Sequence, residues 1–448
     1  EVGGHLNEDY FGGDLKGIQQ KLPYLHEMGV DFIYLNPIFE AHSNHRYNTA
    51  DYLNVDPLLG TNEDFEALCT AAKKYGIGIV LDGVFSHTGS DSRYFNREDR
   101  YGEGGAYRDP SSPYRCWYDF GPQYKGGYRS WWGFETLPEV NEETPSYVEF
   151  ITGPGGVIDT WLRRGAAGFR LDVADELPDE FIEKVRAAVK RVSPEKFLLG
   201  EVWEDATTKF GFNKRRTYLL GKGLDSVMNY PFKNAVLDFV KGKPAEQAMT
   251  EILTICEHYP APAMDTALNF LSTHDTERAL TVIADEPANG RGRAWQSGRC
   301  VTGDAYEEGL LRLRMAYAII YTLPGVPCLY YGDEIAMQGY RDPFNRAFFR
   351  WDAHEQRLRP VLAQLAQLRH TCEAFRTGQL RVLRAEDGIL HYQRVGKVET
   401  AEIIVNRTEH IIVETLASGK STEVNPMGFT IVVEEVGHNP NHSYYDYV

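Results

Sequence analysis

The sequence lacks closely spaced cysteines and long apolar runs. Its six cysteines are scattered over 448 residues without a Cys-x-x-Cys pair, so neither a zinc site nor a disulfide framework is indicated. The longest apolar stretch, Ala316 to Gly332, is interrupted by Pro324 and Pro327 and is too short to span a membrane. We therefore expect reduced thiols, a cytoplasmic setting and no membrane partner.

Positive charge is also scarce. Lysine and arginine number 47 against 64 acidic residues, which gives a formal net charge of −17. Such a balance opposes binding to nucleic acid or to an anionic membrane surface. The chain is 42% hydrophobic and 25% charged, as globular proteins are, and its length suits one α/β barrel with a small satellite domain.

Short apolar runs rich in β-branched and aromatic residues recur, each followed by a loop and a segment with helical spacing. Asp179 to Val192 is amphipathic, and Asp64 to Tyr75 follows two capping candidates, Thr61 and Asn62. This alternation is typical of parallel strands joined by helices. The runs are Phe32 to Ile38, Ile77 to Phe85, Gly168 to Val173, Phe197 to Trp203, Ser226 to Phe232, Ala267 to His274 and Val326 to Gly332.

The spacing of these runs predicts an α/β fold, a (β/α)₈ barrel, over residues 1–89 and 145–371. Residues 90–144 are rich in Gly, Tyr, Trp, Asp and Pro with little periodicity, and we interpret them as an inserted loop domain that forms a wall of the site. Residues 372–448 carry alternating segments that predict a C-terminal antiparallel β-sandwich.

Only seven parallel strands can be counted, whereas a closed barrel of this type needs eight. The missing strand would precede Phe32, where residues 1–15 offer only a loop rich in Gly, Asn and Asp. Either an upstream segment lies outside this sequence or the sheet is not a closed barrel. The absence of an initiator Met leaves open both a removed signal peptide and an upstream region.

Polar residues cluster at the carboxyl ends of the apolar runs, where a parallel barrel builds its active site. Arg170 and Asp172 alternate onto the same face, so the guanidinium can hold the carboxylate ionised, as a nucleophile requires. Glu201 ends the next run beside Trp203, an environment suited to a general acid, and Asp275 ends a later one. Each of these residues alone would more often be an ion pair or a helix cap.

The convergence of three carboxylates favours a catalytic role over a structural one. Acidic side chains at neighbouring strand ends repel one another unless a developing positive charge needs them. Glycoside cleavage has that need, because its transition state resembles an oxocarbenium ion. The chain is also 12% aromatic, and although most of these rings would serve packing, exposed rings can stack on sugars.

Four segments, in order and spacing, resemble the signature regions of the α-amylase family. They are AspGlyValPheSerHis (82–87), GlyPheArgLeuAspValAlaAspGlu (168–176), GlyGluValTrp (200–203) and PheLeuSerThrHisAsp (270–275). Residues 47–52 and 325–334 extend the resemblance over most of the chain. LeuProGluValAsn (137–141), ValAlaAspGlu (173–176) and ThrHisAspThrGluArg (273–278) look most like the neopullulanase, cyclomaltodextrinase and maltogenic amylase branch.

The resemblance implies roles for individual residues. Asp172 would be the nucleophile, Glu201 the acid/base and Asp275 the carboxylate that stabilises the transition state. The remaining residues would bind substrate: Tyr47, His87, Arg170 and His274 around the sugar at the cleavage point, Asp342 and Arg346 at the next sugar on the non-reducing side, and Glu176 and Trp203 near the acceptor side.

Two departures from the branch concern the substrate. Asp175 stands where the branch usually has Asn, and Asn48 where many members have Asp. The first leaves open the balance between α-1,4 and α-1,6 bonds and between hydrolysis and transfer. No cofactor and no metal site are expected; calcium stays an alternative, for which only GlyGlyAsp at 12–14 remains of the motif near the barrel start.

We therefore expect a retaining α-glucoside hydrolase acting on maltooligosaccharides, cyclodextrins or pullulan, in starch degradation and carbohydrate metabolism. The alternatives are a glucanotransferase or exo-acting α-glucosidase, and an amylase-like binding subunit without catalysis. Retention of Asp172, Glu201 and Asp275 argues against the last, since a binding protein has no need of a nucleophile. The oligomeric state stays open, a homo-oligomer included.

Overall fold

The structure, a computed structural model, describes residues 6–436 and 443–447. The chain falls into two units, and each is described by itself. The first unit comprises Glu1–Val202 and Ala206–Val227, and the second comprises Trp203–Asp205 and Met228–Val448.

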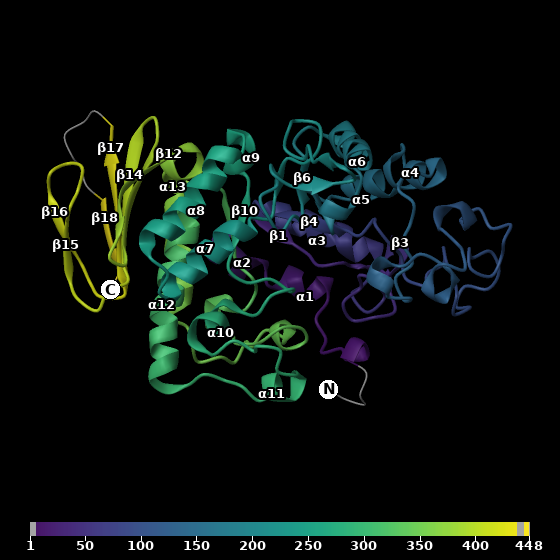
Figure 1. The fold of residues 1–448 in the computed structure, drawn as a ribbon, viewed down its shortest axis with the longest axis horizontal. Coiled ribbons are helices and arrows are strands. Elements are labelled where there is room, and N and C mark those ends of the chain that lie inside the picture. Colours follow the sequence, from purple (N-terminus) through teal and green to yellow (C-terminus); the bar gives the residue numbers. More distant parts are fainter. Residues whose placement is uncertain (1–5, 437–442, 448) are drawn as a thin grey trace. The chain divides into compact units, whose positions relative to one another are not determined.

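The first unit is built on a five-stranded parallel sheet with the strand order β1-β4-β5-β6-β9 (Figure 1). In this register Asp82 pairs with Arg170, and Leu171 pairs with Gly200, so the carboxyl ends of three consecutive strands meet at one edge. That edge is where the sequence predicts the functional side chains. The strands are β1 (Phe32–Tyr34), β4 (Gly78–Gly83), β5 (Gly168–Leu171), β6 (Phe197–Gly200) and β9 (Ser226–Val227).

Helices between these strands begin where the sequence predicts caps. The Thr61 hydroxyl accepts from the Asp64 amide and the Asp64 carboxylate accepts from the Thr61 amide, which forms a capping box before α3. The predicted helix over Asp179–Val192 is α6, with acidic residues in its first turn and basic residues in its last. The other elements of this unit are α1 (Leu15–Gln20), α2 (Leu22–Glu27), β2 (Phe39–Ala41), β3 (Thr49–Val55), α3 (Asn62–Lys74), α4 (Pro145–Thr152), α5 (Val157–Arg163), β7 (Phe210–Gly211) and β8 (Lys214–Arg215).

The second unit contains the parallel pair β10 and β11, surrounded by helices. One prediction is wrong: the apolar run Ser226 to Phe232 does not form a strand over its whole length. The strand ends at Val227, because Asn229 caps α7 and Pro231 lies in its first turn. The elements are α7 (Tyr230–Lys241), α8 (Ala245–His258), α9 (Ala261–Asp265), β10 (Leu268–Phe270), α10 (Ala279–Ala284), α11 (Arg293–Ser297), α12 (Gly303–Thr322), β11 (Val326–Cys328), α13 (Leu358–Thr371) and α14 (Ala374–Thr377).

The C-terminal part of this unit is antiparallel, as predicted. A five-stranded sheet with the order β12-β13-β14-β17-β18 is faced by the hairpin β15-β16 (Figure 1). Ile404, Leu416, Val424 and Val432 form an apolar cluster in this part of the unit. The strands are β12 (Gln379–Glu386), β13 (Ile389–Val395), β14 (Glu399–Asn406), β15 (Ile412–Thr415), β16 (Ser421–Val424), β17 (Gly428–Glu435) and β18 (Ser443–Tyr447).

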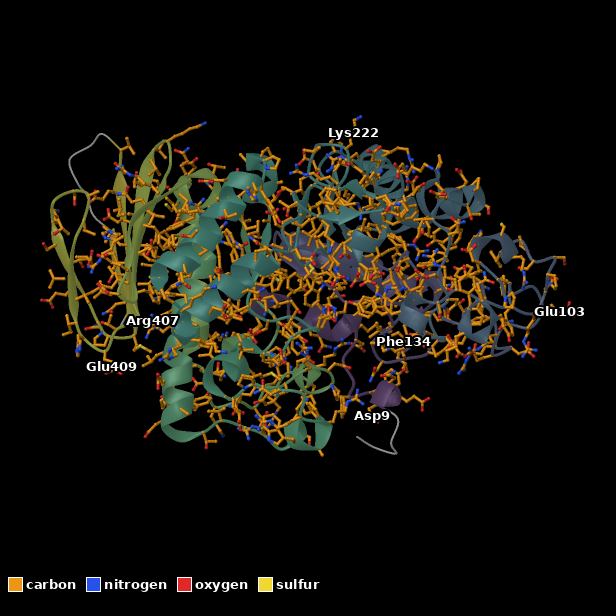
Figure 2. The ribbon with its side chains drawn as sticks, viewed as in Figure 1. Asp9, Glu103, Phe134, Lys222, Arg407 and Glu409 are labelled. Carbon is orange, nitrogen blue, oxygen red and sulfur yellow. The ribbon has the colours of Figure 1, made fainter. Side chains whose placement is uncertain are left out.

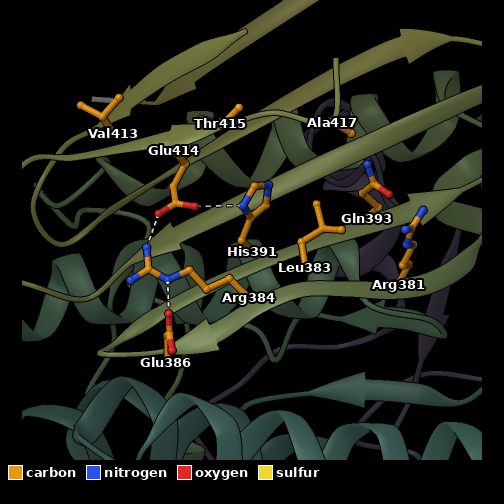
Figure 3. A pocket seen from close by; sticks show the side chains of 10 residues that line it. All are labelled: Arg381, Leu383, Arg384, Glu386, His391, Gln393, Val413, Glu414, Thr415 and Ala417. Atoms are coloured by element: carbon orange, nitrogen blue, oxygen red, sulfur yellow. Dashed lines mark hydrogen bonds and ion pairs between the residues drawn. The ribbon is translucent and has the colours of Figure 1, made fainter. Parts of the chain in front are cut away.

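A groove of about 630 Å³ lies between β12, β13 and β15 (Figure 3). At its base the buried His391 ring contacts two carboxylates, Glu402 at 2.6 Å and Glu414 at 3.1 Å. Glu414 also accepts from Arg384, which pairs with Glu386. His391 on β13 and Arg384 on β12 both contact Glu414 on β15, so these contacts hold the hairpin on the sheet.

The α/β architecture and the C-terminal antiparallel layer are confirmed. Seven parallel strands are present in the described part of the chain, and within residues 6–31 none precedes β1. The expected boundaries of the inserted segment and of the C-terminal domain stay predictions. No helix in the described residues is both long and apolar enough to cross a membrane.

Candidate active site

The strand ends of the first unit converge on one guanidinium. Arg170, at the end of β5, is fully buried. Its Nη1 donates to both carboxylate oxygens of Asp82 (2.8 and 3.1 Å) and to Oδ1 of Asp172 (2.9 Å). Its Nη2 lies 2.8 Å from Oε2 of Glu201. One cation therefore links carboxylates that follow β4, β5 and β6.

The charge of Arg170 is secured by these partners. Burial alone would lower the pKa of the guanidinium, but the carboxylates of Asp82 and Glu201 outweigh it and hold the pKa well above its usual range. The hydroxyls of Tyr34 and Tyr47 both donate to Oδ2 of Asp82, at 2.7 and 2.8 Å. The prediction that Arg170 and Asp172 share one face is confirmed, and Asp82 anchors the arrangement from the neighbouring strand.

Asp172 and Glu201 are 7% and 4% exposed. Between them in sequence stands Val173, whose backbone is left-handed at φ 41° and ψ 48°, a conformation that β-branched residues avoid. This turn directs the Val173 amide to Oε2 of Glu201, at 2.8 Å. The strained backbone at Val173 thus gives Glu201 a second hydrogen-bond donor besides Arg170. The two donors together orient the Glu201 carboxylate.

His87 follows β4 and is buried behind Tyr47. Its Nε2 lies 3.0 Å from the Tyr47 carbonyl oxygen, so this nitrogen carries the proton, and its Nδ1 lies 2.8 Å from the Ser86 hydroxyl. Burial lowers the pKa of His87 from 6.5 to about 4. The ring is therefore neutral near pH 7 and can act there as a hydrogen-bonding group but not as a cation.

This lowered pKa predicts acid sensitivity. Between pH 6.5 and about 4 the unfolded chain binds a proton at His87 that the folded chain refuses, so the free energy of unfolding must fall as the pH falls through this range. His87→Gln removes this contribution. We expect denaturant titrations to show that the wild type loses about 3 kcal/mol more than the variant between pH 7 and pH 4.

His410→Gln, at an exposed histidine of the C-terminal domain, is the matched control and should follow the wild-type pH dependence. Parallel curves for the wild type and His87→Gln would mean that His87 titrates normally in the folded protein.

The segment 90–144 brings aromatic rings to this site. A backbone bridge joins His87 to Glu139, and the Trp131 ring lies 5.5 Å from the His87 ring. Trp131 and its neighbour Trp132 both donate from Nε1 to the carboxylate of Glu176, at 2.7 and 2.9 Å. Trp132 is 76% exposed. The inserted segment therefore contributes a wall of indole rings beside the residues that follow Asp172.

Phe134 extends this wall: its ring stacks on Trp131 with centroids 6.1 Å apart, and it lies at the surface (Figure 2). Exposed rings of this kind offer apolar faces to a ligand.

Asp175, one of the two departures named from the sequence, has a charged partner. Asp175 lies 3.2 Å from the ammonium of Lys209, and both side chains are half-buried. Arg216, from the same excursion between β6 and β9, donates to the carbonyl oxygens of Asp175 and Leu177 and to the Asp179 carboxylate. The excursion is thereby fixed to the segment that follows Asp172.

The second unit holds the other predicted residues. His274 and Asp275 follow β10, and the His274 Nε2 lies 3.0 Å from the Asp275 carboxylate. Arg346 Nε donates to the His274 carbonyl (3.0 Å) and pairs with Asp342 (3.0 Å), while its Nη2 lies 3.7 Å from Asp275. These four predicted residues therefore form one polar cluster.

Trp203 also belongs to the second unit. Its ring stacks on that of Tyr230 with centroids 4.0 Å apart and planes at 15°, and 44% of its surface is exposed. Tyr230 therefore supports the exposed ring of Trp203. The sequence predicts Trp203 as a site residue but not this support.

The predicted site residues thus fall into two groups, one in each unit. In the first unit Arg170 joins Asp172 to Glu201, and His87 contacts Tyr47, which shares Asp82 with Arg170; Glu176 contacts the indole wall. The residues that the prediction missed are Tyr34, Asp82, Trp131 and Trp132. Tyr34 is the last residue of β1 but stands inside the apolar run Phe32 to Ile38, so no pattern in the sequence indicates that a strand ends there.

The GlyGlyAsp remnant of the calcium motif, at 12–14, lies directly before α1. Asp14 caps α1 by accepting from the Gly17 amide at 2.6 Å. Within residues 6–436 and 443–447, no three His, Cys, Asp or Glu side chains are gathered so that they could hold a metal ion.

Residues 4–377 match the alpha amylase catalytic domain family. The chain is 33% identical over 411 residues to a cyclomaltodextrinase of Geobacillus thermopakistaniensis (strain MAS1), covering 89% of this chain and 63% of the relative. It is 32% identical over 432 residues to neopullulanase 2 of Thermoactinomyces vulgaris, covering 93% of this chain and 66% of the relative. The chain spans less than a third of the amylopullulanase of Thermoanaerobacter thermohydrosulfuricus, to which it is 36% identical over 429 residues, 87% of this chain and 28% of the relative.

Solved structures agree with these matches. The cyclic alpha-maltosyl-(1→6)-maltose hydrolase of Arthrobacter globiformis superposes with a TM-score of 0.83 at 28% identity, covering 96% of this chain and 91% of the other. Both the match over residues 4–377 and the relatives above 30% identity cover most of the sequence. The chain therefore belongs to the alpha-amylase family.

Proposed function

We propose that the chain hydrolyses α-glucosidic bonds of short or cyclic α-glucans by double displacement. The observation that carries this proposal is Arg170, whose guanidinium holds Asp172 on one nitrogen and Glu201 on the other. Carboxyl groups bound to one guanidinium lie close together, and a retaining mechanism needs a separation of about 5 Å. A buried cation next to Asp172 also keeps it ionised for nucleophilic attack.

In this scheme Asp172 attacks the anomeric carbon while Glu201 protonates the departing oxygen. A covalent glycosyl-enzyme forms, and Glu201 then acts as base on the water that releases the sugar. Asp275 stabilises the transition state, with His274, Asp342 and Arg346 binding beside it. No cofactor takes part.

The substrate class is proposed from the relatives. Proteins named cyclomaltodextrinase and neopullulanase, and a solved structure named as a hydrolase of a cyclic maltosyl-maltose, are similar to most of this chain. The exposed Trp132 and Phe134 on the inserted segment suit an oligosaccharide longer than the sugar at the cleavage point. We propose cyclodextrins, pullulan and maltooligosaccharides as substrates, acted on in the cytoplasm.

A transglycosylase is the second candidate, and Asp175 favours it. The Asp175–Lys209 ion pair places a hydrogen-bond donor and an acceptor next to Glu176, on the side where the acceptor would bind, and these groups can hold a sugar hydroxyl in the place of water. Longer products from maltotriose at high concentration would identify transfer.

The test is a panel of cyclodextrin, pullulan, starch and maltotriose, assayed side by side, with NMR of the first product. We expect hydrolysis of at least the cyclic or the short linear glucans, and the α-anomer as the first product. A β-anomer appearing first would rule out double displacement, and an inactive protein that still binds cyclodextrin would point to the binding subunit.

A further inference from the structure

One buried carboxamide contacts three carbonyl oxygens of the loop that carries Asp275. Asn345, in the 3₁₀ helix η7 (Phe344–Arg346), is fully buried. Its Nδ2 lies within hydrogen-bond distance of three backbone carbonyl oxygens, those of Thr273 (3.3 Å), His274 (2.8 Å) and Thr276 (2.8 Å). All three acceptors belong to the four-residue turn around Asp275.

The orientation of the carboxamide follows from these acceptors. A flipped amide would set its oxygen against three carbonyl oxygens, so the nitrogen must face the turn. Among the described residues, the buried Oδ1 of Asn345 has no hydrogen-bond partner. The Asn345 amide nitrogen is thus hydrogen-bonded to the turn, whereas its amide oxygen is not paired. This difference indicates that the contact with the turn determines where the Asn345 side chain lies.

Other hydrogen bonds act on the same turn: the Thr276 hydroxyl accepts from the Thr273 amide at 3.2 Å. The Thr273 hydroxyl accepts from the Asp275 amide (3.1 Å), and Arg346 binds the His274 carbonyl and approaches the Asp275 carboxylate. Arg346 follows Asn345 in η7, so the same short helix supplies both donors. The Asp275 side chain itself is 30% exposed, and burial does not hold it in place.

We propose that Asn345 is a positioning residue, which fixes the turn from Thr273 to Thr276 and thereby aims the Asp275 carboxylate at the reacting sugar. This inference rests on the proposed function, in which Asp275 stabilises the transition state. Loss of the carboxamide releases three carbonyls at once and lets the turn shift. A misplacement of about 1 Å lowers the rate of a positioned reaction by about 100-fold.

The chain offers a matched control. Asn406, in the C-terminal sheet, is also fully buried, and its Nδ2 also donates to three backbone carbonyls, those of His410 (2.8 Å), Val424 (3.1 Å) and Asn425 (3.0 Å). Asn406→Ala removes the same chemistry from a turn that carries no candidate residue. It should lower the thermal stability without changing the reaction.

The experiment compares Asn345→Ala, Asn345→Ser and Asn406→Ala with the wild type, on a glucan that the wild type hydrolyses, below the unfolding temperature of every variant. We expect kcat to fall about 100-fold in Asn345→Ala, with KM changed by less than about threefold, since the lost interaction acts in the transition state. Asn345→Ser keeps one donor and should regain about fivefold in kcat. Asn406→Ala should keep kcat within about twofold.

A kcat of Asn345→Ala equal to that of Asn406→Ala would overturn the inference. If Asn345→Ala does not fold, Asn345→Ser decides the matter: a kcat about 20-fold below the wild type supports positioning, and wild-type kcat contradicts it. These outcomes require an active wild type. A wild type without glucan hydrolysis would instead refute the proposed function, so the two failures are distinguishable.

Discussion

Asp172→Asn is expected to lower kcat for α-glucan hydrolysis by at least about 10⁴-fold. The amide has nearly the same shape as the carboxylate, and its oxygen can still accept from Arg170, but it cannot form the glycosyl-enzyme bond. Rates on cyclodextrin or maltotriose, measured with protein whose circular dichroism matches the wild type, check the prediction.

The matched control is Asp159→Asn. Asp159 is also buried and also pairs with an arginine, Arg191 at 2.6 Å, but it lies on α5 outside the candidate site. This exchange should reduce stability and leave kcat within about twofold. Substantial turnover by Asp172→Asn would show that another residue is the nucleophile.

Arg170→Ala should have the largest effect on stability. The substitution leaves the carboxylates of Asp82, Asp172 and Glu201 without the cation they share. Removing one partner of a buried ion pair costs about 3–5 kcal/mol, because an uncompensated charge remains in the interior. We expect this loss in the free energy of unfolding at pH 7, and glucan hydrolysis should disappear with it.

The pH dependence identifies the cause of this loss. Without the guanidinium, protonation of the buried carboxyl groups becomes favourable in the folded state, so the deficit of Arg170→Ala should shrink from pH 7 to pH 5. Arg394→Ala is the control: Arg394 is fully buried, and within residues 6–436 and 443–447 its side chain donates to the carbonyl oxygens of Gly378 and Thr322. The loss of unfolding free energy in Arg394→Ala should not become smaller from pH 7 to pH 5. Equal acid recovery in both variants would refute the explanation from carboxylates.

Local patterns in the sequence predict local structure well. The helix over Asp179–Val192 and the cap at Thr61 follow from spacing and from side-chain chemistry within a few residues. The pairing of Arg170 with Asp172 follows from the alternation of a strand. In each case the physical cause lies inside a short stretch of chain.

Contacts between distant segments could not be predicted in this way. The Tyr34 hydroxyl reaches Asp82 because β1 and β4 are parallel neighbours, and Trp131 reaches Glu176 because the inserted segment folds back beside His87. No periodic pattern in the sequence indicates that these distant segments contact one another. The end of β9 was missed for another reason, since Asn229 and Pro231 begin a helix inside an otherwise apolar run.

The Asp175–Lys209 ion pair has a consequence for how this enzyme family can diversify. An exchange of Asp175 for the asparagine usual in its branch would leave the ammonium of Lys209 facing a neutral amide, so the effect of that exchange depends on which residue occupies position 209. We therefore expect the effects of substitutions at positions 175 and 209 to depend on each other, and sequences that diverge at this point to replace both residues together.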